Sequence, residues 1–239
     1  MQNFYAMSVS IPFFSNYWHL ITRLGEVQYL LPAALGVCLV LIRSDGTRLL
    51  AVRWLQTLLI AAFITLASKI AFIGWGIGSA RFNFTGVSGH AMFAASIVPL
   101  LVATLASRFP QGWQKLAVFL SFALVLLVGV SRVAVGAHSA SEVIAGLLLG
   151  STASAMAIAH KGLPRGSWNQ YVPMVVLAWL VLAPFQTPQL PTHSLVTWSA
   201  LQLSGHAKPY TRTDMMREHH ARTARQPASD LKGKPFSTG

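Results

Sequence analysis

The sequence predicts an all-α, polytopic integral membrane helix bundle with about six transmembrane helices. Hydrophobic residues make up 54% of the chain and charged residues only 10%, against roughly 25% charged residues in ordinary soluble domains. Apolar blocks of helix length recur along the chain, and short segments that each carry two basic residues separate several of them. This composition excludes a disordered chain and argues against a soluble globular fold.

The six predicted spans are residues 29–42, 49–67, 91–106, 116–130, 143–159 and 172–185. Several are shorter than the ~20 residues that a straight span needs, so their flanks must contribute. Residues 1–24 mix aromatic and polar positions, which predicts an interfacial N-terminal segment rather than a cleavable signal peptide. Residues 25–185 form the predicted transmembrane domain, and residues 186–239 are expected to be a polar basic tail.

Charge sorts the connections between the spans. Segments 43–48, 108–115 and 160–165 each carry two basic residues, so the positive-inside rule places them in the cytoplasm. The segments around 69–90 and 131–138, together with both termini, then lie on the opposite side. Tryptophans are expected in the interfacial belts of the membrane, namely Trp18, Trp54, Trp75, Trp113 and Trp168.

The sequence lacks the residues that several kinds of chemistry require. The only acidic residue between Asp45 and Asp214 is Glu142, so a carboxylate pair or a carboxylate cage for a metal ion is not expected, and we predict neither a metal nor a cofactor. The single cysteine, Cys38, excludes an intramolecular disulfide and a thiolate zinc site. The basic residues alternate with apolar blocks instead of forming one patch, which indicates membrane loops and no nucleic-acid partner.

Placing polar residues within such an apolar chain costs free energy, so each of them is expected to have a structural or functional role. They gather at helix ends on one predicted face of the membrane, in three clusters: residues 69–81, residues 88–90, and residues 131–142. Their convergence on one face is the main indication of function.

The clusters combine anion-binding groups with two histidines. Ser88-Gly89-His90 precedes an apolar helix, whose N-terminal N–H groups form an anion site. Basic side chains add charge and forked donors for phosphate oxygens; they are Lys69, Arg81 and Arg132. His138 and Glu142 are four residues apart, so the carboxylate can accept the imidazole N–H. This set suits a phosphate ester that is attacked by a histidine.

These residues resemble the motifs of the type 2 phosphatidic acid phosphatases, which share a core with vanadium haloperoxidases. The family pattern has a Lys and Arg segment, then (P)SGH, then SR with five residues to His and three more to Asp. Here Val87 precedes Ser88-Gly89-His90, and Ser131-Arg132 is followed at the family spacing by His138, with Glu142 in place of Asp. The family Arg lies seven residues after the Lys, but Gly76 stands seven after Lys69, and Arg81 is the next basic residue.

The resemblance implies a role for each matched residue. His138 would be the nucleophile, Glu142 would orient it, and His90 would be the general acid and then the base for water. The remaining residues would bind phosphate: Lys69, Arg81, Ser88, Gly89 and Arg132. The implied protein is a metal-independent phosphatase of a lipid phosphomonoester or pyrophosphate, located in the cytoplasmic (inner) membrane, with its site on the outer, periplasmic side. The bilayer and a phosphorylated lipid would be its partners, and the sequence leaves its oligomeric state open.

Other interpretations of the same residues stay open. Lys69 can snorkel from a helix end, Arg81 can anchor the interface, and Ser88 is expected to cap its helix as well as touch phosphate. Ser88 and His138 would form the site of an intramembrane serine protease, and a non-catalytic lipid-phosphate binding or transport protein would keep the phosphate site. A second triplet, Ser204-Gly205-His206, precedes no apolar helix and is interpreted as chance.

Overall fold

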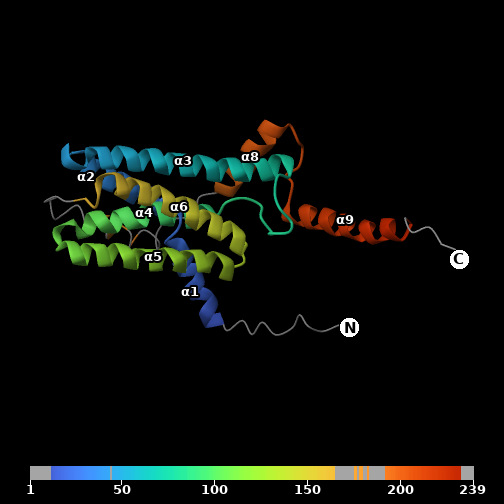
Figure 1. The fold of residues 1–239 in the computed structure, drawn as a ribbon, viewed down its shortest axis with the longest axis horizontal. Helices are drawn as coiled ribbons and strands as arrows, with labels where there is room; N and C mark the ends of the chain where they lie inside the picture. The colour runs from blue at the N-terminus through green and yellow to red at the C-terminus, as the bar shows by residue number, and fades with distance from the viewer. Residues whose placement is uncertain are drawn as a thin grey trace, which may run out of the picture. The chain divides into compact units, whose positions relative to one another are not determined.

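The computed structural model is all-helical over the residues that it describes, which are 12–43, 45–164, 175–176, 178–179, 182 and 192–232 (Figure 1). The chain forms two compact units. The first unit comprises Met1–Thr65 and Val87–Leu190, and the second comprises Leu66–Gly86 and Pro191–Gly239. The predicted all-α fold class is confirmed, and each unit is described below by itself.

The first unit is built from helices that are mostly long enough to cross a bilayer. In chain order they are α1 (Pro12–Arg23), α2 (Val27–Ile42), α3 (Asp45–Trp75), α4 (Gly89–Leu105), α5 (Gln111–Ala134) and α6 (Ala140–Lys161), with a short 3₁₀ turn, η1 (Ala106–Arg108), after α4. Helix α3 has 31 residues and continues into the second unit. At 1.5 Å per residue it is about 46 Å long, more than the roughly 30 Å hydrocarbon core.

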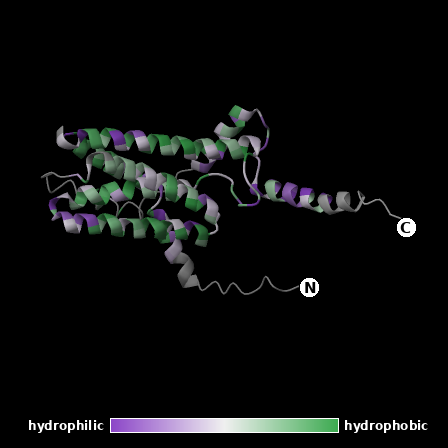
Figure 2. Cartoon of the chain, viewed as in Figure 1, coloured by the Kyte–Doolittle hydropathy of each residue, from purple (hydrophilic) through white to green (hydrophobic). Residues whose placement is uncertain are grey.

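Five candidate membrane spans lie within the described residues: Tyr17–Ile42, Gly46–Trp75, Gly89–Arg108, Gln111–Ala134 and Ala140–Ala159. They match the first five predicted spans and extend each one at its flanks. The hydrophobic colour follows α2 to α6 along most of their length (Figure 2). The sixth predicted span, 172–185, lies mostly outside the described residues.

Helix α4 is the centre of the first unit. It packs against α2, α5 and α6, and most of its residues are buried. Trp54 of α3 is fully buried, and its indole Nε1 donates to the Ser96 carbonyl of α4 at 2.8 Å. The prediction that Trp54 lies in an interfacial belt is therefore wrong, because this indole finds its acceptor inside the bundle.

Helices α4 and α6 approach each other to backbone contact at two glycines of α6. A Cβ atom added at Gly150 would lie 2.3 Å from the Met92 carbonyl oxygen, and one added at Gly146 would lie 2.6 Å from the Ser88 carbonyl oxygen. On α4 the facing side chains are the small Ala91 and Ala95. Small residues four positions apart let transmembrane helices approach closely, so this pair sets the spacing between α4 and α6.

The predicted N-terminal segment and tail contain helices. Helix α1 covers residues 12–23 of the segment that was expected to be interfacial, and it packs against α5. The expected polar tail forms α8 (Thr192–Ser204) and α9 (Arg212–Lys232) in the second unit. There Ala200 of α8 packs with Phe72 and Ile73 of α3. The sequence gives no sign of these packed helices, because the segment has few apolar residues and no long apolar block.

We predict that Gly150→Ala destabilises the protein by about 1–3 kcal/mol, since an overpacked interior must shift its backbone to make room. Gly112→Ala is the matched control, because a Cβ there has no neighbour within 4 Å. Thermal unfolding in detergent measures both variants. A melting temperature of Gly150→Ala equal to that of Gly112→Ala would contradict the close approach.

Candidate active site

The first part of the site is the N-terminus of α4, where the chain reads Ser88-Gly89-His90. Ser88 precedes the helix in an extended conformation, and its side chain makes no capping hydrogen bond. The expectation that Ser88 caps α4 is therefore wrong. Its hydroxyl is completely buried and has no hydrogen-bond partner among the residues that the structure describes. A buried hydroxyl without a partner costs about 1–3 kcal/mol, and here it stands at a helix end that favours anions.

A backbone hydrogen bond joins this motif to the second one. The Ser88 N–H donates to the carbonyl oxygen of Glu142 at 3.1 Å. The bond forms where α6 lies against α4, since the Ser88 carbonyl is the group that approaches Gly146. The two motifs are more than forty residues apart in sequence, and the helix contact brings them together.

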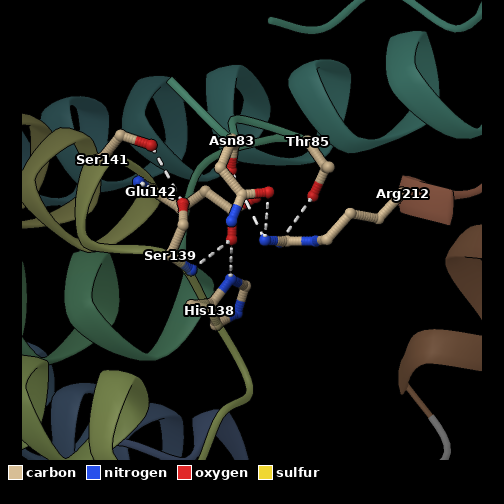
Figure 3. A network of polar contacts seen from close by, with 7 residues as sticks. All are labelled: Asn83, Thr85, His138, Ser139, Ser141, Glu142 and Arg212. Carbon is tan, nitrogen blue, oxygen red and sulfur yellow. Dashed lines mark hydrogen bonds and ion pairs between the residues drawn. The ribbon is translucent and has the colours of Figure 1, made fainter. Parts of the chain in front are cut away.

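The second part of the site is the N-terminus of α6. His138 Nδ1 lies 2.7 Å from Glu142 Oε2, with 14% of the histidine side chain and none of the glutamate exposed (Figure 3). The same Oε2 accepts the Ser139 N–H at 3.1 Å, and the Ser139 hydroxyl accepts the Glu142 N–H at 3.4 Å. Ser139 and Glu142 therefore form a capping box. When Nδ1–H donates to the carboxylate, the neutral ring carries its lone pair on Nε2.

The turn between α5 and α6 fixes the spacing from Arg132 to His138. Gly136 has φ +69, and its N–H donates to the Val133 carbonyl, while the Ala137 and His138 N–H groups both donate to the Arg132 carbonyl. This is a Schellman motif, which needs a left-handed residue at the position of Gly136. The five residues between Arg132 and His138 are thus the length of chain that this turn requires.

The Arg132 side chain is anchored on one side and unsatisfied on the other. Its Nη1 donates to the Thr22 hydroxyl at 2.7 Å, and within the described part of the chain its buried Nε–H has no hydrogen-bond partner. Glu26, which is also buried, attracts the guanidinium electrostatically. Arg132 and Ser88 thus each keep a buried donor that no described group of the protein satisfies, as a site for an oxyanion requires.

Sequence reasoning missed the connection between α1 and α2. Thr22 and Glu26 flank Gly25, where an added Cβ would lie 3.3 Å from both the Cβ and the carbonyl oxygen of His90. This connection therefore lies against His90 and holds Arg132. The sequence did contain a signal for Glu26, because it is one of only three acidic residues before residue 186. An acidic residue next to apolar spans is a functional candidate by default. The S-x-x-E pattern that begins at Ser139 also indicated a capping box in the sequence.

The second unit holds the other two predicted phosphate ligands. Lys69 lies in α3, and Gly86 packs against it, so that a Cβ at Gly86 would lie 3.1 Å from Lys69 Cγ. Arg81 is exposed, and its guanidinium lies 5.6 Å from the centre of the Phe82 ring. This contact suits the interfacial-anchor interpretation of Arg81 as well as the phosphate one, and phosphate binding by Lys69 and Arg81 stays a prediction.

The second SGH triplet has a different structure. Ser204 is the last residue of α8, Gly205 has φ +71, and His206 Nδ1 donates to the Gly74 carbonyl at 2.6 Å. The triplet thus ends a helix, where carbonyl oxygens and not N–H groups are left without partners. It offers no anion site of the kind formed at Ser88.

Comparison with known proteins assigns the family. The sequence model of the PAP2 superfamily matches residues 6–162. The chain belongs to the PAP2 superfamily. It is 37% identical over 205 residues to the "Uncharacterized 22.5 kDa protein in cps region" of Klebsiella pneumoniae, covering 84% of this chain and 98% of that protein. It is 33% identical over 70 residues to "Phosphatidylglycerophosphatase B" of Bacillus subtilis (strain 168), covering 28% of this chain and 34% of that one.

One solved structure shares the fold. It is the crystal structure of a transmembrane PAP2-type phosphatidylglycerolphosphate phosphatase from Bacillus subtilis, with a TM-score of 0.50 and 22% identity, covering 64% of this chain and 78% of that chain. Together these findings describe this PAP2 protein as a multi-pass membrane phosphatase.

We predict that Glu142→Gln lowers the rate of phosphate release by roughly 10²–10³-fold, as the loss of one preorganised electrostatic partner does. Glutamine keeps the capping box and removes only the charge beside His138. Glu142→Asp keeps the charge with a shorter reach and should retain much more activity.

The control for this pair is substrate affinity, which should change little because the phosphate ligands lie elsewhere in the chain. Steady-state turnover and thermal unfolding of both variants give the comparison. Near-normal turnover by Glu142→Gln would make Glu142 a capping residue without a catalytic effect.

Proposed function

We propose that this PAP2 protein hydrolyses a phosphomonoester or pyrophosphate of a membrane lipid, without a metal ion, through a phosphohistidine intermediate at His138. The observation that carries the proposal is the 2.7 Å contact between His138 Nδ1 and the fully buried Glu142 carboxylate. It directs the lone pair of the imidazole to Nε2. The buried donors of Ser88 and Arg132 support it, because they suit a phosphate group.

In the first half-reaction, His138 Nε2 attacks phosphorus and the bond to the lipid oxygen breaks. The leaving oxygen takes a proton from His90, and the phosphoryl group stays on Nε2. Positive charge grows on the His138 ring during the attack, and the Glu142 carboxylate stabilises that charge in a site of low dielectric constant.

In the second half-reaction, His90, now neutral, takes a proton from water as the water oxygen attacks phosphorus. The bond from phosphorus to Nε2 breaks, and inorganic phosphate leaves. Throughout, the phosphoryl oxygens would be held by the basic side chains and by the N-terminus of α4; the proposed ligands are Lys69, Arg81, Ser88, Gly89 and Arg132.

The membrane-spanning helices and the relatives support a lipid substrate. A bilayer delivers acyl or prenyl chains, and the proposed site needs only a phosphate head group. Phosphatidylglycerophosphate is named for the Bacillus subtilis relatives; phosphatidic acid, a polyprenyl pyrophosphate and a lipid A phosphate carry the same chemistry. We place the protein in the inner membrane, with the site on the periplasmic side, opposite the short basic connections at 43–48, 108–115 and 160–165.

Two alternatives differ from this proposal in their chemistry. An intramembrane serine protease needs a hydrogen bond between Ser88 and its base, but the Ser88 hydroxyl has no hydrogen-bond partner, and His138 Nδ1 pairs with Glu142. A non-catalytic protein that binds or transports lipid phosphate would keep the same donors. Turnover of a chromogenic phosphate ester by the purified protein separates both alternatives from a phosphatase.

We predict that His138→Ala abolishes phosphate release while the protein stays folded and membrane-inserted, because the nucleophile is lost. His90→Ala should be severe for phosphatidic acid and milder for p-nitrophenyl phosphate, whose leaving group needs little proton donation. Phosphate release from both substrates measures the two variants.

Each half of this prediction can fail separately. More than a few per cent of the wild-type rate in His138→Ala would show that His138 is not the nucleophile. An equal loss for both substrates in His90→Ala would show that His90 is not the general acid.

We also expect vanadate to inhibit competitively and EDTA to have no effect. Vanadate takes the five-coordinate shape of the transferring phosphoryl group, and mimics of a transition state bind more tightly than substrates. The expectation that EDTA has no effect rests on the shortage of acidic residues, the usual metal ligands, in the sequence. Activity that EDTA removes and a divalent ion restores would contradict the metal-independent mechanism.

A further inference from the structure

The family places an arginine seven residues after its lysine, and the structure gives a physical reason for its absence here. Gly76 stands at that position with φ +70, and a Cβ added there would lie 3.2 Å from Cδ1 and from Cε1 of the Tyr210 ring. A larger residue at position 76 would therefore meet backbone strain and a tight contact with this ring. The ring of Tyr210, from the C-terminal segment, occupies the space that an arginine would need.

The C-terminal segment is attached to the last turn of α3. The Tyr210 N–H donates to the Ile73 carbonyl at 2.9 Å, and His206 Nδ1 donates to the Gly74 carbonyl at 2.6 Å. The Tyr210 ring packs edge-to-face on Phe72, with ring centres 5.5 Å apart. These carbonyls are among the four that the end of a helix leaves without partners. The segment therefore supplies hydrogen-bond donors to the C-terminal end of α3.

Arg212, the first residue of α9, extends from the same segment to the connection between α3 and α4. Its Nη1 donates to Asn83 Oδ1 at 2.8 Å and to the Asn83 carbonyl at 3.5 Å, and its Nη2 donates to Thr85 Oγ1 at 3.2 Å (Figure 3). The side chain is half-buried. Asn83 has the left-handed φ of +50, so the fork of Arg212 holds the connection at a bend.

The start of α9 is itself fixed. Thr211 and Asp214 cap each other, since the Thr211 N–H donates to Asp214 Oδ2 and the Asp214 N–H donates to the Thr211 hydroxyl. Hydrogen bonds from the Thr211 hydroxyl and N–H lower the pKa of Asp214, so its charge is present at neutral pH. Arg212 is therefore presented from a capped helix start.

The connection that Arg212 holds leads directly to the proposed phosphate ligands. Gly86, one residue after Thr85, packs against the backbone and Cγ of Lys69. Ser88 follows two residues later in the chain. Whatever fixes Asn83 and Thr85 therefore fixes the path of the chain from Lys69 to Ser88.

We propose that the C-terminal segment occupies the place of the missing family arginine and that Arg212 is a positioning residue of the phosphatase. Tyr210 fills the space at Gly76, and Arg212 clamps the connection that carries the chain past Lys69 to Ser88. This proposal rests on the proposed phosphatase function. Residues 206–212 lie beyond the 6–162 that the PAP2 superfamily model matches, so the clamp lies outside the matched family core.

The test compares three variants of the full-length protein in detergent. Arg212→Ala removes the fork, Arg212→Lys keeps the charge but loses the two-pronged donor, and Arg217→Ala is the control, because Arg217 is 76% exposed and makes only a 3.9 Å ion pair with Asp214. Turnover of p-nitrophenyl phosphate and phosphatidic acid gives kcat and KM. Hydrogen exchange follows the amides of Ser79, Asn83 and Phe84, which are hydrogen-bonded within the connection.

We expect Arg212→Ala to lower kcat/KM by about tenfold or more, since a displacement of about 1 Å can cost on the order of 10²-fold. The loss should include a rise in KM, because the phosphate ligands Lys69 and Ser88 flank the loosened connection. Exchange of the three amides should accelerate. Arg212→Lys should show a smaller loss, and Arg217→Ala should match the wild type in both measurements.

Several outcomes would overturn the clamp. The first is hydrogen exchange of the three amides in Arg212→Ala that equals the wild type. The second is faster exchange in Arg212→Ala with unchanged kcat/KM. The third is full activity of Arg212→Lys, which would show that the positive charge alone is required. Thr85→Val removes an acceptor from the opposite side and should reproduce the exchange change if Arg212→Ala fails to fold. A wild-type protein without turnover would contradict the proposed function, whereas the exchange experiment reports on the clamp in either case.

Discussion

Backbone contact between α4 and α6 at Gly146 and Gly150 sets the distance between the two histidine motifs. Because no side chain separates the helices at these points, the N-terminus of α4 comes within a backbone hydrogen bond of Glu142. The hydrophobic effect does not drive helix association within lipid, so close packing and polar contacts must hold such a pair. The catalytic proposal depends on this contact, since the motifs come from distant parts of the chain.

Two buried donors without partners are the second constraint. The Ser88 hydroxyl and the Arg132 Nε–H are withdrawn from water and find no acceptor among the described residues, which costs stability. Their neighbours are tied down: the Ser88 N–H bonds to Glu142, and Arg132 Nη1 bonds to Thr22. Donors that are fixed in advance lose little freedom when charge develops on a bound group, which is how preorganised sites accelerate reactions.

Much of this arrangement could be predicted from the sequence. The all-α membrane fold followed from apolar blocks and scarce charges. A spacing of four residues predicted the pairing of His138 with Glu142, although His138 lies in the turn before α6 and not within the helix. The tertiary contacts could not be predicted, because they depend on which surfaces meet. Nothing local marks Thr22 as the partner of Arg132, or Ser96 as the acceptor for Trp54.

The contacts of the C-terminal residues could not be predicted from their composition. Residues 186–239 read as a polar tail because only a few apolar side chains, such as Ala200 and Met215, pack against α3. These residues act through specific contacts, such as the packing of Tyr210 on Gly76 and the hydrogen bonds of Arg212 to Asn83. Composition does not reveal such contacts. The absence of a basic residue seven positions after Lys69 was visible in the sequence, but its compensation required the path of the chain in space.

The covalent intermediate gives the most direct test of the central claim. The His90→Ala variant, which lacks the proposed base for water, would be mixed with a radiolabelled phosphate ester that has a good leaving group, quenched with alkali and digested. The account predicts an alkali-stable, acid-labile label on the peptide that contains His138, and no label in His138→Ala. A label on Ser88, or turnover by an active enzyme with no label on His138, would contradict the phosphohistidine mechanism.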